Sequence, residues 1–304
     1  MTLPVCLPEN AGIAYSGASP RSPLVLSAAQ ARRMLAAPNP HGKPNSDVIR
    51  PLAEVADLLQ HPRQRWVIDF APDLDEREAA LYRLPFARAL GLVRAADNRA
   101  AGAPQRTMRI AIAKCSRCIV TPAAGPRRVL AWLPAETLPG RGLVVFARDD
   151  DGFFGVLHSR FHAAWALRVG AQLREREADF RYTPTTCFET FPFPWAPTTP
   201  LGKLTRTQDG QRTAIARAAQ ALDAARNEWL GDRSDPRRTL PALYHEQPAW
   251  LQHARAELDA AVAAAYGSPA DLPDEDVVAR LLALNRARAP SAPAAPPGNM
   301  STNS

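Results

Sequence analysis

Residues 141–194 read RGLVVFARDDDGFFGVLHSRFHAAWALRVGAQLREREADFRYTPTTCFETFPFP, and this stretch decides the fold. Residues 143–147 form an apolar run that predicts a strand, and the polar run at residues 148–152 ends in glycine, which favours a tight turn. The closing F-P-F-P excludes a helix and predicts an extended exit. Between them, apolar residues recur at the spacing of one buried helical face, at Phe154, Leu157, Phe161 and Trp165.

The chain before this stretch predicts short strands and short helices. Residues 1–24 are rich in Pro, Ser and Gly and are expected to form an extended N-terminal segment. Ser27 caps a predicted helix at residues 28–35. Residues 74–93 predict a second helix, which Pro85 should kink or split. Strands are expected at residues 66–70, 108–112, 118–121 and 129–133.

The chain after residue 196 changes character. Residues 197–210 are rich in Pro, Thr and Gly and predict a linker, and residues 211–289 show three segments of helical apolar spacing, the third beginning at a capping Asp274. Residues 290–304 are rich in Pro, Ala, Ser and Asn and are predicted to be disordered. The fold class is therefore α+β: a mixed α/β domain over residues 1–196, followed by a small α-helical C-terminal region.

Charge is distributed unevenly along the 304 residues. Residues 1–196 contain 25 Lys and Arg against 18 Asp and Glu, whereas residues 197–304 contain 12 against 12, so the whole net charge of +7 lies in the first part. A basic domain beside a neutral one favours a polyanionic partner; an arginine-rich composition bias is the alternative. No run of about 18 apolar residues predicts a membrane span, no secretory signal is visible, and four cysteines fit a reducing cytoplasm.

Three other features of the sequence are candidate sites. Cys115 and Cys118 form a single C-x-x-C, and a structural zinc site usually needs a second such pair, so ordinary thiols are expected. His158 and His162 lie four apart on one predicted helical face. A zinc-protease helix has glutamate directly after its first histidine, whereas residue 159 is serine, and the sequence offers no third ligand. A role in the core or in a phosphate contact is therefore favoured over metal binding. Asp69 is expected to form a turn or a backbone cap.

Six motifs occur in order along residues 10–196. They are N-P-H-G-K-P-N-S-D-V-I-R-P (39–51), W-V-I-D-F (66–70), I-V-T-P (119–122), F-A-R-D-D-D (146–151), L-H-S-R-F-H (157–162) and R-Y-T-P-T-T-C-F-E-T-F-P-F-P (181–194). As a set they resemble the target recognition domain of MmeI-like (type IIL) restriction–modification enzymes and their class I SAM-dependent DNA adenine methyltransferase relatives. Residues 237–244 and 266–274 resemble the C-terminal helical region of that family.

The resemblance implies a module that recognises a specific sequence in double-stranded DNA for an enzyme that methylates adenine N6 with S-adenosylmethionine. Neither the F-x-G-x-G cofactor loop nor the Asn-Pro-Pro-aromatic motif of the family's catalytic domain occurs in these 304 residues; residues 39–42 read N-P-H-G. No catalytic, cofactor-binding or metal residue is therefore assigned, and S-adenosylmethionine is expected in a missing or partner methyltransferase domain or chain. A specificity subunit, half of a split enzyme and a decayed fragment all remain open.

The resemblance also indicates which residues contact DNA. Residues 123–128 predict a basic hairpin tip containing Arg127 and Arg128, near a family loop that helps to read bases; a solvated turn is the alternative. Glu177, Asp179 and Arg181 alternate along the chain, so an extended backbone would place them on one face. Arginine can donate two hydrogen bonds to guanine, and a carboxylate can accept one from the cytosine amino group. In the family, residues at matching positions help to set the accepted base pair.

Other functions compete with DNA recognition. Instead of contacting a base, Arg181 could form an ion pair with a neighbouring carboxylate of the same chain. For the whole chain, the second hypothesis is a non-catalytic helical protein-interaction module whose basic face is incidental, and the third is metal-dependent hydrolysis through the two histidines. Salt-dependent binding to duplex DNA separates the first two hypotheses, and a bound-metal assay decides the third.

Overall fold

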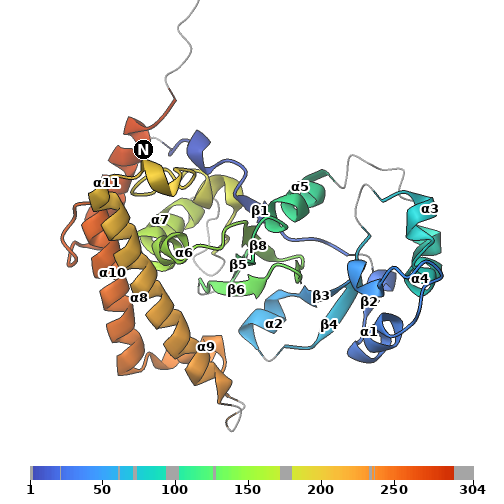
Figure 1. The fold of residues 1–304 in the computed structure, drawn as a ribbon. Helices are drawn as coiled ribbons and strands as arrows, with labels where there is room; N and C mark the ends of the chain where they lie inside the picture. Colours follow the sequence, from blue (N-terminus) through green and yellow to red (C-terminus); the bar gives the residue numbers. More distant parts are fainter. Residues whose placement is uncertain are drawn as a thin grey trace, which may run out of the picture.

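The structure is a computed structural model that describes residues 3–20, 22–60, 62–70, 74–93, 103–125, 128–171, 180–232, 235 and 237–290. It contains two small β-sheets with helices around them and a bundle of longer helices at one end (Figure 1). The α+β fold class predicted from the sequence is confirmed. The tail expected to be disordered, residues 290–304, lies outside the described residues except for its first position.

The first sheet has the strand order β1-β8-β5-β6, and all of its pairings are antiparallel. It is buried on both faces, because Ile119 packs into one hydrophobic cluster while its neighbours Cys118 and Val120 pack into another. The N-terminal segment contributes an edge strand rather than only an extended lead. The strands are β1 (Ala14–Ser16), β5 (Arg117–Pro122), β6 (Ala131–Pro134) and β8 (Leu143–Phe146).

The second sheet has the order β2-β4-β3-β7, in which β3 and β7 are parallel and the other pairs antiparallel. Helix α1 (Ala28–Leu35) packs beside it and has the predicted bounds, because Ser27 and Gln30 form a reciprocal capping box. The strands are β2 (Val25–Leu26), β3 (Ile49–Ala53), β4 (Arg65–Ile68) and β7 (Leu138–Pro139).

The strand predicted at residues 108–112 is wrong, because these residues form the last turns of helix α5 (Ala103–Ile112). Met108 and Ile112 are buried, but Ile110 between them is 51% exposed. Residues four apart share a face of a helix, whereas a strand would have placed all three on one side. Over five residues, the apolar alternation that suggested a strand is equally consistent with a helix.

The helix predicted at residues 74–93 is split into α3 (Glu76–Ala79) and α4 (Arg83–Val93). Pro85 falls in the first turn of α4, where its missing N–H would have had no helical acceptor. The break also shifts the helical phase. Ala89 is buried, whereas Leu90, which would share a face with Tyr82 in one continuous helix, is 36% exposed.

The helix predicted from residue 153 is two helices, α6 (Asp151–His158) and α7 (Arg160–Ala171). Asp150 caps α6 by accepting the amide N–H of Phe153, so the polar run before it is a helix start rather than a tight turn. Ser159 has extended backbone angles and separates the two helices. The four apolar residues predicted to face the core, from Phe154 to Trp165, are all buried.

The C-terminal region is helical, as predicted, and packs directly on α6 and α7. Helix α8 starts at Arg206, inside the stretch expected to be a linker, because Thr205 forms a capping box with Gln208. One hydrophobic cluster joins Phe154 and Trp165 to Ile215, Leu258 and Leu281, so the core crosses the expected domain boundary. Figure 1 shows α8 and α10 side by side. The helices are α8 (Arg206–Gly231), α9 (Leu240–Glu246), α10 (Ala249–Ala265) and α11 (Asp274–Ala287).

Short helical segments connect these elements. The N-terminal one is tied down by Asn10, whose side-chain amide donates to the carbonyls of Phe188 and Phe191. The segments are η1 (Pro8–Asn10), η2 (Ser22–Leu24), η3 (Asn45–Asp47), α2 (Val55–Leu59), the π-helical turn η4 (Pro184–Phe188) and η5 (Leu201–Lys203).

Candidate functional site

Arg181 lies on extended backbone beside the β5–β6 connection. It forms an antiparallel bridge with Ala124, and the amide N–H of Tyr182 donates to the carbonyl of Ala123 at 2.9 Å. Successive side chains therefore point to opposite sides: Tyr182 is buried and Arg181 is exposed. Arg181 thus has the extended backbone on which its proposed alignment with residues two positions away depends. Its predicted partners Glu177 and Asp179 lie outside the described residues, as does Arg127.

Arg128 does not project from a hairpin tip. Its guanidinium turns inward and donates to the carbonyl of Leu157 and to Nδ1 of His162. Leu157 belongs to the last turn of α6, whose carbonyls have no partner within the helix, and a cation there also complements the helix dipole. Burial lowers the pKa of Arg128 to about 10. This side chain, expected either to contact DNA from a hairpin tip or to lie in a solvated turn, thus forms part of the wall of a pocket.

His162 is fully buried between Arg128 and Tyr182. Nδ1 of His162 lies against the Arg128 guanidinium and 3.0 Å from the carbonyl of Leu157, and Nε2 lies 3.0 Å from the Tyr182 hydroxyl. Burial, and next the charge of Arg128, lower the pKa of His162 well below its ordinary value. Burial raises the pKa of Tyr182 well above its ordinary value. Both groups are therefore neutral and hold the strand at residue 182 against α7.

His158 belongs to a different network, because the break at Ser159 places the two histidines on separate helices. Its Nε2 lies 3.2 Å from the Tyr244 hydroxyl and 3.5 Å from Nη1 of Arg226. Burial, followed by the charges of Arg226, Arg128 and Arg255, lowers the pKa of His158 well below its ordinary value. Among the residues that the structure describes, no three His, Cys, Asp or Glu side chains gather as a metal site requires.

Arg226 is charged, yet it is buried, because it lies on the apolar face of α8. It donates to the carbonyl of Leu130 at 2.6 Å and to the carboxylate of Asp223 at 2.5 Å. It therefore ties the helical bundle to the start of β6. Sequence reasoning missed this residue, yet a signal existed: Arg226 follows Leu222 by four positions, so the phase of the helix places it inside.

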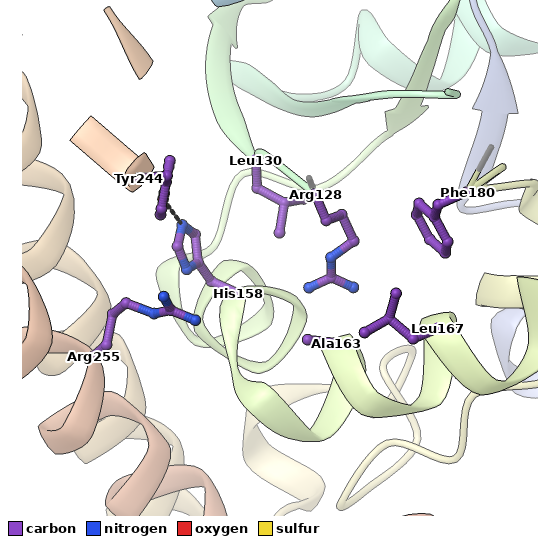
Figure 2. Close-up of a pocket in the computed structure, with 8 residues that line it drawn as sticks. All are labelled: Arg128, Leu130, His158, Ala163, Leu167, Phe180, Tyr244 and Arg255. Atoms are coloured by element: carbon purple, nitrogen blue, oxygen red, sulfur yellow. Dashed lines mark hydrogen bonds between the residues drawn. The ribbon is translucent and has the colours of Figure 1, made fainter. Parts of the chain in front are cut away.

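A pocket of about 230 Å³ lies between the β5–β6 connection, α6, α7 and α10. Figure 2 shows the guanidinium groups of Arg128 and Arg255 approaching it from opposite sides, with His158 between them and hydrogen-bonded to Tyr244. No carboxylate is among its described lining residues, so it suits an anion. It is lined by Arg128, Leu130, His158, Ala163, Leu167, Phe180, Tyr244 and Arg255.

A second basic cluster surrounds Asp69, which is buried rather than part of a turn. Its carboxylate pairs with Arg109 of α5 and lies 3.7 Å from Arg50 of β3. Burial raises the pKa of Asp69, and the charges of Arg109 and Arg50 act against that rise. The turn or backbone cap predicted for Asp69 is therefore wrong. Its carboxylate instead forms an ion-pair cluster that joins α5 to the second sheet. The two cysteines of the C-x-x-C are free thiols, and burial raises the pKa of Cys118 to about 12.

Within the described residues, no helix combines the length and the apolar character that a bilayer crossing requires.

Comparison with known proteins identifies the family. The family model described as the MmeI target recognition domain matches residues 16–195. A solved structure described as "Structure of Type IIL restriction-modification enzyme MmeI in complex with DNA has implications for engineering of new specificities" shares the fold, with a TM-score of 0.64 and 17% sequence identity. That match covers 95% of this chain, and so extends into the C-terminal helices, but only 36% of the MmeI chain. No curated protein matches. Because the family model covers more than half of its length, this chain belongs to the MmeI target recognition domain family.

Proposed function

We propose that this chain recognises a specific sequence in double-stranded DNA, as the target recognition module of a site-specific DNA adenine (N6) methyltransferase in a restriction–modification system. The match of residues 16–195 to the MmeI target recognition domain carries the proposal. The excess of seven positive charges over residues 1–196 supports it, because DNA binding is driven largely by phosphate neutralisation. The catalytic domain and its S-adenosylmethionine would be supplied by a methyltransferase domain or chain that acts with these 304 residues.

The first experiment measures binding to duplex DNA at several salt concentrations. Each phosphate that the protein neutralises lowers the logarithm of the affinity by about 0.9 per decade of salt. We expect several such contacts and therefore a slope of several units. An affinity that stays the same from low to physiological salt would refute DNA recognition and favour the protein-interaction hypothesis.

The same preparation tests where the chemistry resides. The chain alone should transfer no methyl group from labelled S-adenosylmethionine to DNA, because the cofactor loop and the Asn-Pro-Pro-aromatic motif do not occur in it. If a methyltransferase chain is encoded upstream, its addition should restore adenine methylation. Methyl transfer by this chain alone would contradict the proposed division of roles.

Base readout is proposed for Glu177, Asp179 and Arg181. The exposed side chain and extended backbone of Arg181 support it, since such a side chain can reach base edges in the major groove. Asp179→Arg or Arg181→Asp should change the preference at one position of the recognised word by roughly 1–3 kcal/mol, with the fold intact. Site selection on each variant, together with a melting curve, tests this. An internal ion pair predicts a lower melting temperature and an unchanged preference.

A further inference from the structure

The pocket between the β5–β6 connection and helix α10 has an unusual balance of charge. Arg128 and Arg255 both line it, and a third arginine, Arg226, lies directly behind His158. Only Arg226 has a carboxylate at hydrogen-bonding distance in the described part of the chain, that of Asp223. The positive groups lie close enough to act on each other, because Arg255 contributes to the lowered pKa of Arg128.

Arg128 is half-buried, and the hydrogen-bonding capacity of its guanidinium is only partly used. Its two acceptors are neutral, a carbonyl and an uncharged imidazole, and its Nε is buried without a partner among the described atoms. A partly desolvated cation with neutral partners alone is costly, because the energy of desolvation is not offset by an opposite charge. The folded chain thus holds a preformed cationic site that a bound anion would complete.

The remaining walls favour a phosphate that carries organic substituents. The Tyr244 hydroxyl and His158 supply neutral polar groups on one side, while Phe180 and the 58% exposed Leu167 supply apolar surface on the other. A phosphodiester has this double character, with anionic oxygens flanked by the apolar edges of sugars. Phe180 also precedes Arg181 directly, so a phosphate in the pocket would lie next to one of the residues proposed to read bases.

We propose that this pocket binds one phosphate of the DNA backbone, with Arg128 and Arg255 as its two cationic contacts. The inference rests on the proposed function, because it makes the pocket part of the DNA-binding surface. A phosphate contact fixes the register of a protein on the duplex and carries no sequence information. It would therefore position the strand around Arg181 without choosing the base.

Arg255 is the residue to change, because Arg128 also holds the end of α6 and its loss would perturb the fold. Arg255→Gln should reduce the salt slope of duplex binding by about 0.9, the share of one phosphate, and should weaken binding equally for every sequence. Arg255→Lys should keep the slope. The matched control is Arg33→Gln, which removes the same charge from the exposed face of α1. Figure 1 shows α1 at the other end of the molecule from α10, the helix that carries Arg255.

A second measurement uses inorganic phosphate alone and does not depend on DNA binding. At constant ionic strength, phosphate in place of chloride should raise the melting temperature of the wild type and of Arg33→Gln, and should raise that of Arg255→Gln less. If the chain binds duplex DNA but Arg255→Gln changes neither the slope nor the phosphate response, the pocket proposal is wrong and the proposed function stands. If the chain shows no salt-dependent binding to duplex DNA, both the proposed function and the proposal that the pocket holds a DNA phosphate are refuted. This holds even if inorganic phosphate still stabilises the wild type.

Discussion

Gly155 provides the sharpest test of how the helical bundle is joined to the α/β part. It lies in α6 at the contact with α8, and a Cβ atom added there would lie 2.6 Å from Cγ2 of Ile215 and 3.1 Å from Cβ of Ala219. Real Cβ atoms essentially never approach other atoms as closely as the first distance. Gly155→Ala therefore has to push α6 and α8 apart or distort Ile215.

Two opposing terms set the magnitude. Overpacking a core by one methyl group costs typically about 1–3 kcal/mol, and replacing a mid-helix glycine by alanine contributes roughly 0.5–1 kcal/mol in the stabilising direction. With the middle of each range, about 2 against about 0.75 kcal/mol, the net expectation for Gly155→Ala is a loss of about 1 kcal/mol in the free energy of unfolding. Gly210→Ala in α8 is the matched control, because nothing lies within 4 Å of its added Cβ. That substitution should stabilise the protein by roughly 0.5–1 kcal/mol.

Urea denaturation of both variants gives the two free energies, and a double-mutant cycle with Ile215→Ala locates the cause. Ile215→Ala alone should cost about 2–5 kcal/mol through the cavity it leaves. The Gly155→Ala methyl group should fill part of that cavity, so the double variant should lose less than the sum by at least about 1 kcal/mol. Additive losses, or a Gly155→Ala variant as stable as the wild type, would refute the close contact between α6 and α8.

Two further predictions concern buried charge. Burial keeps His158 and His162 neutral in the folded chain, whereas the unfolded chain takes up their protons below pH 6.5, so the free energy of unfolding should fall as pH drops below about 6.5. The fall should be about 1.4 kcal/mol per pH unit for each histidine, and an unchanged slope in His162→Gln would contradict it. Asp69→Ala should lower the free energy of unfolding by about 3 kcal/mol. This is the low end for breaking a buried ion pair, because Arg50 and Arg109 keep contact with water. Urea denaturation measures the loss, and a loss below about 1 kcal/mol would show that the pairs contribute little.

Elements with a strong local signal were predictable from the sequence. The bounds of α1 follow from Ser27 and Gln30, which satisfy each other's backbone groups within four residues. The split of residues 74–93 follows from Pro85 alone. The helix at residues 103–112 was not predictable from its last five residues, because Met108, Ile110 and Ile112 all fit the strand period and only Met108 and Ile112 fit the helical one. Its helical form is fixed by tertiary packing, which buries the first and last of these residues and leaves the middle one in water.

The candidate site was less predictable, because its geometry depends on contacts between distant segments. Arg128 was expected in solvent since it follows a glycine-containing turn, yet its acceptors belong to Leu157 and His162, about 30 residues further along. No local pattern encodes that pairing. Arg226 differs, because its phase on α8 already placed a charge on a buried face, where it needs a partner from another element. A charged residue that interrupts an apolar helical face therefore predicts a contact between elements, and here that contact, with the carbonyl of Leu130, joins the bundle to the sheet beside the proposed phosphate pocket.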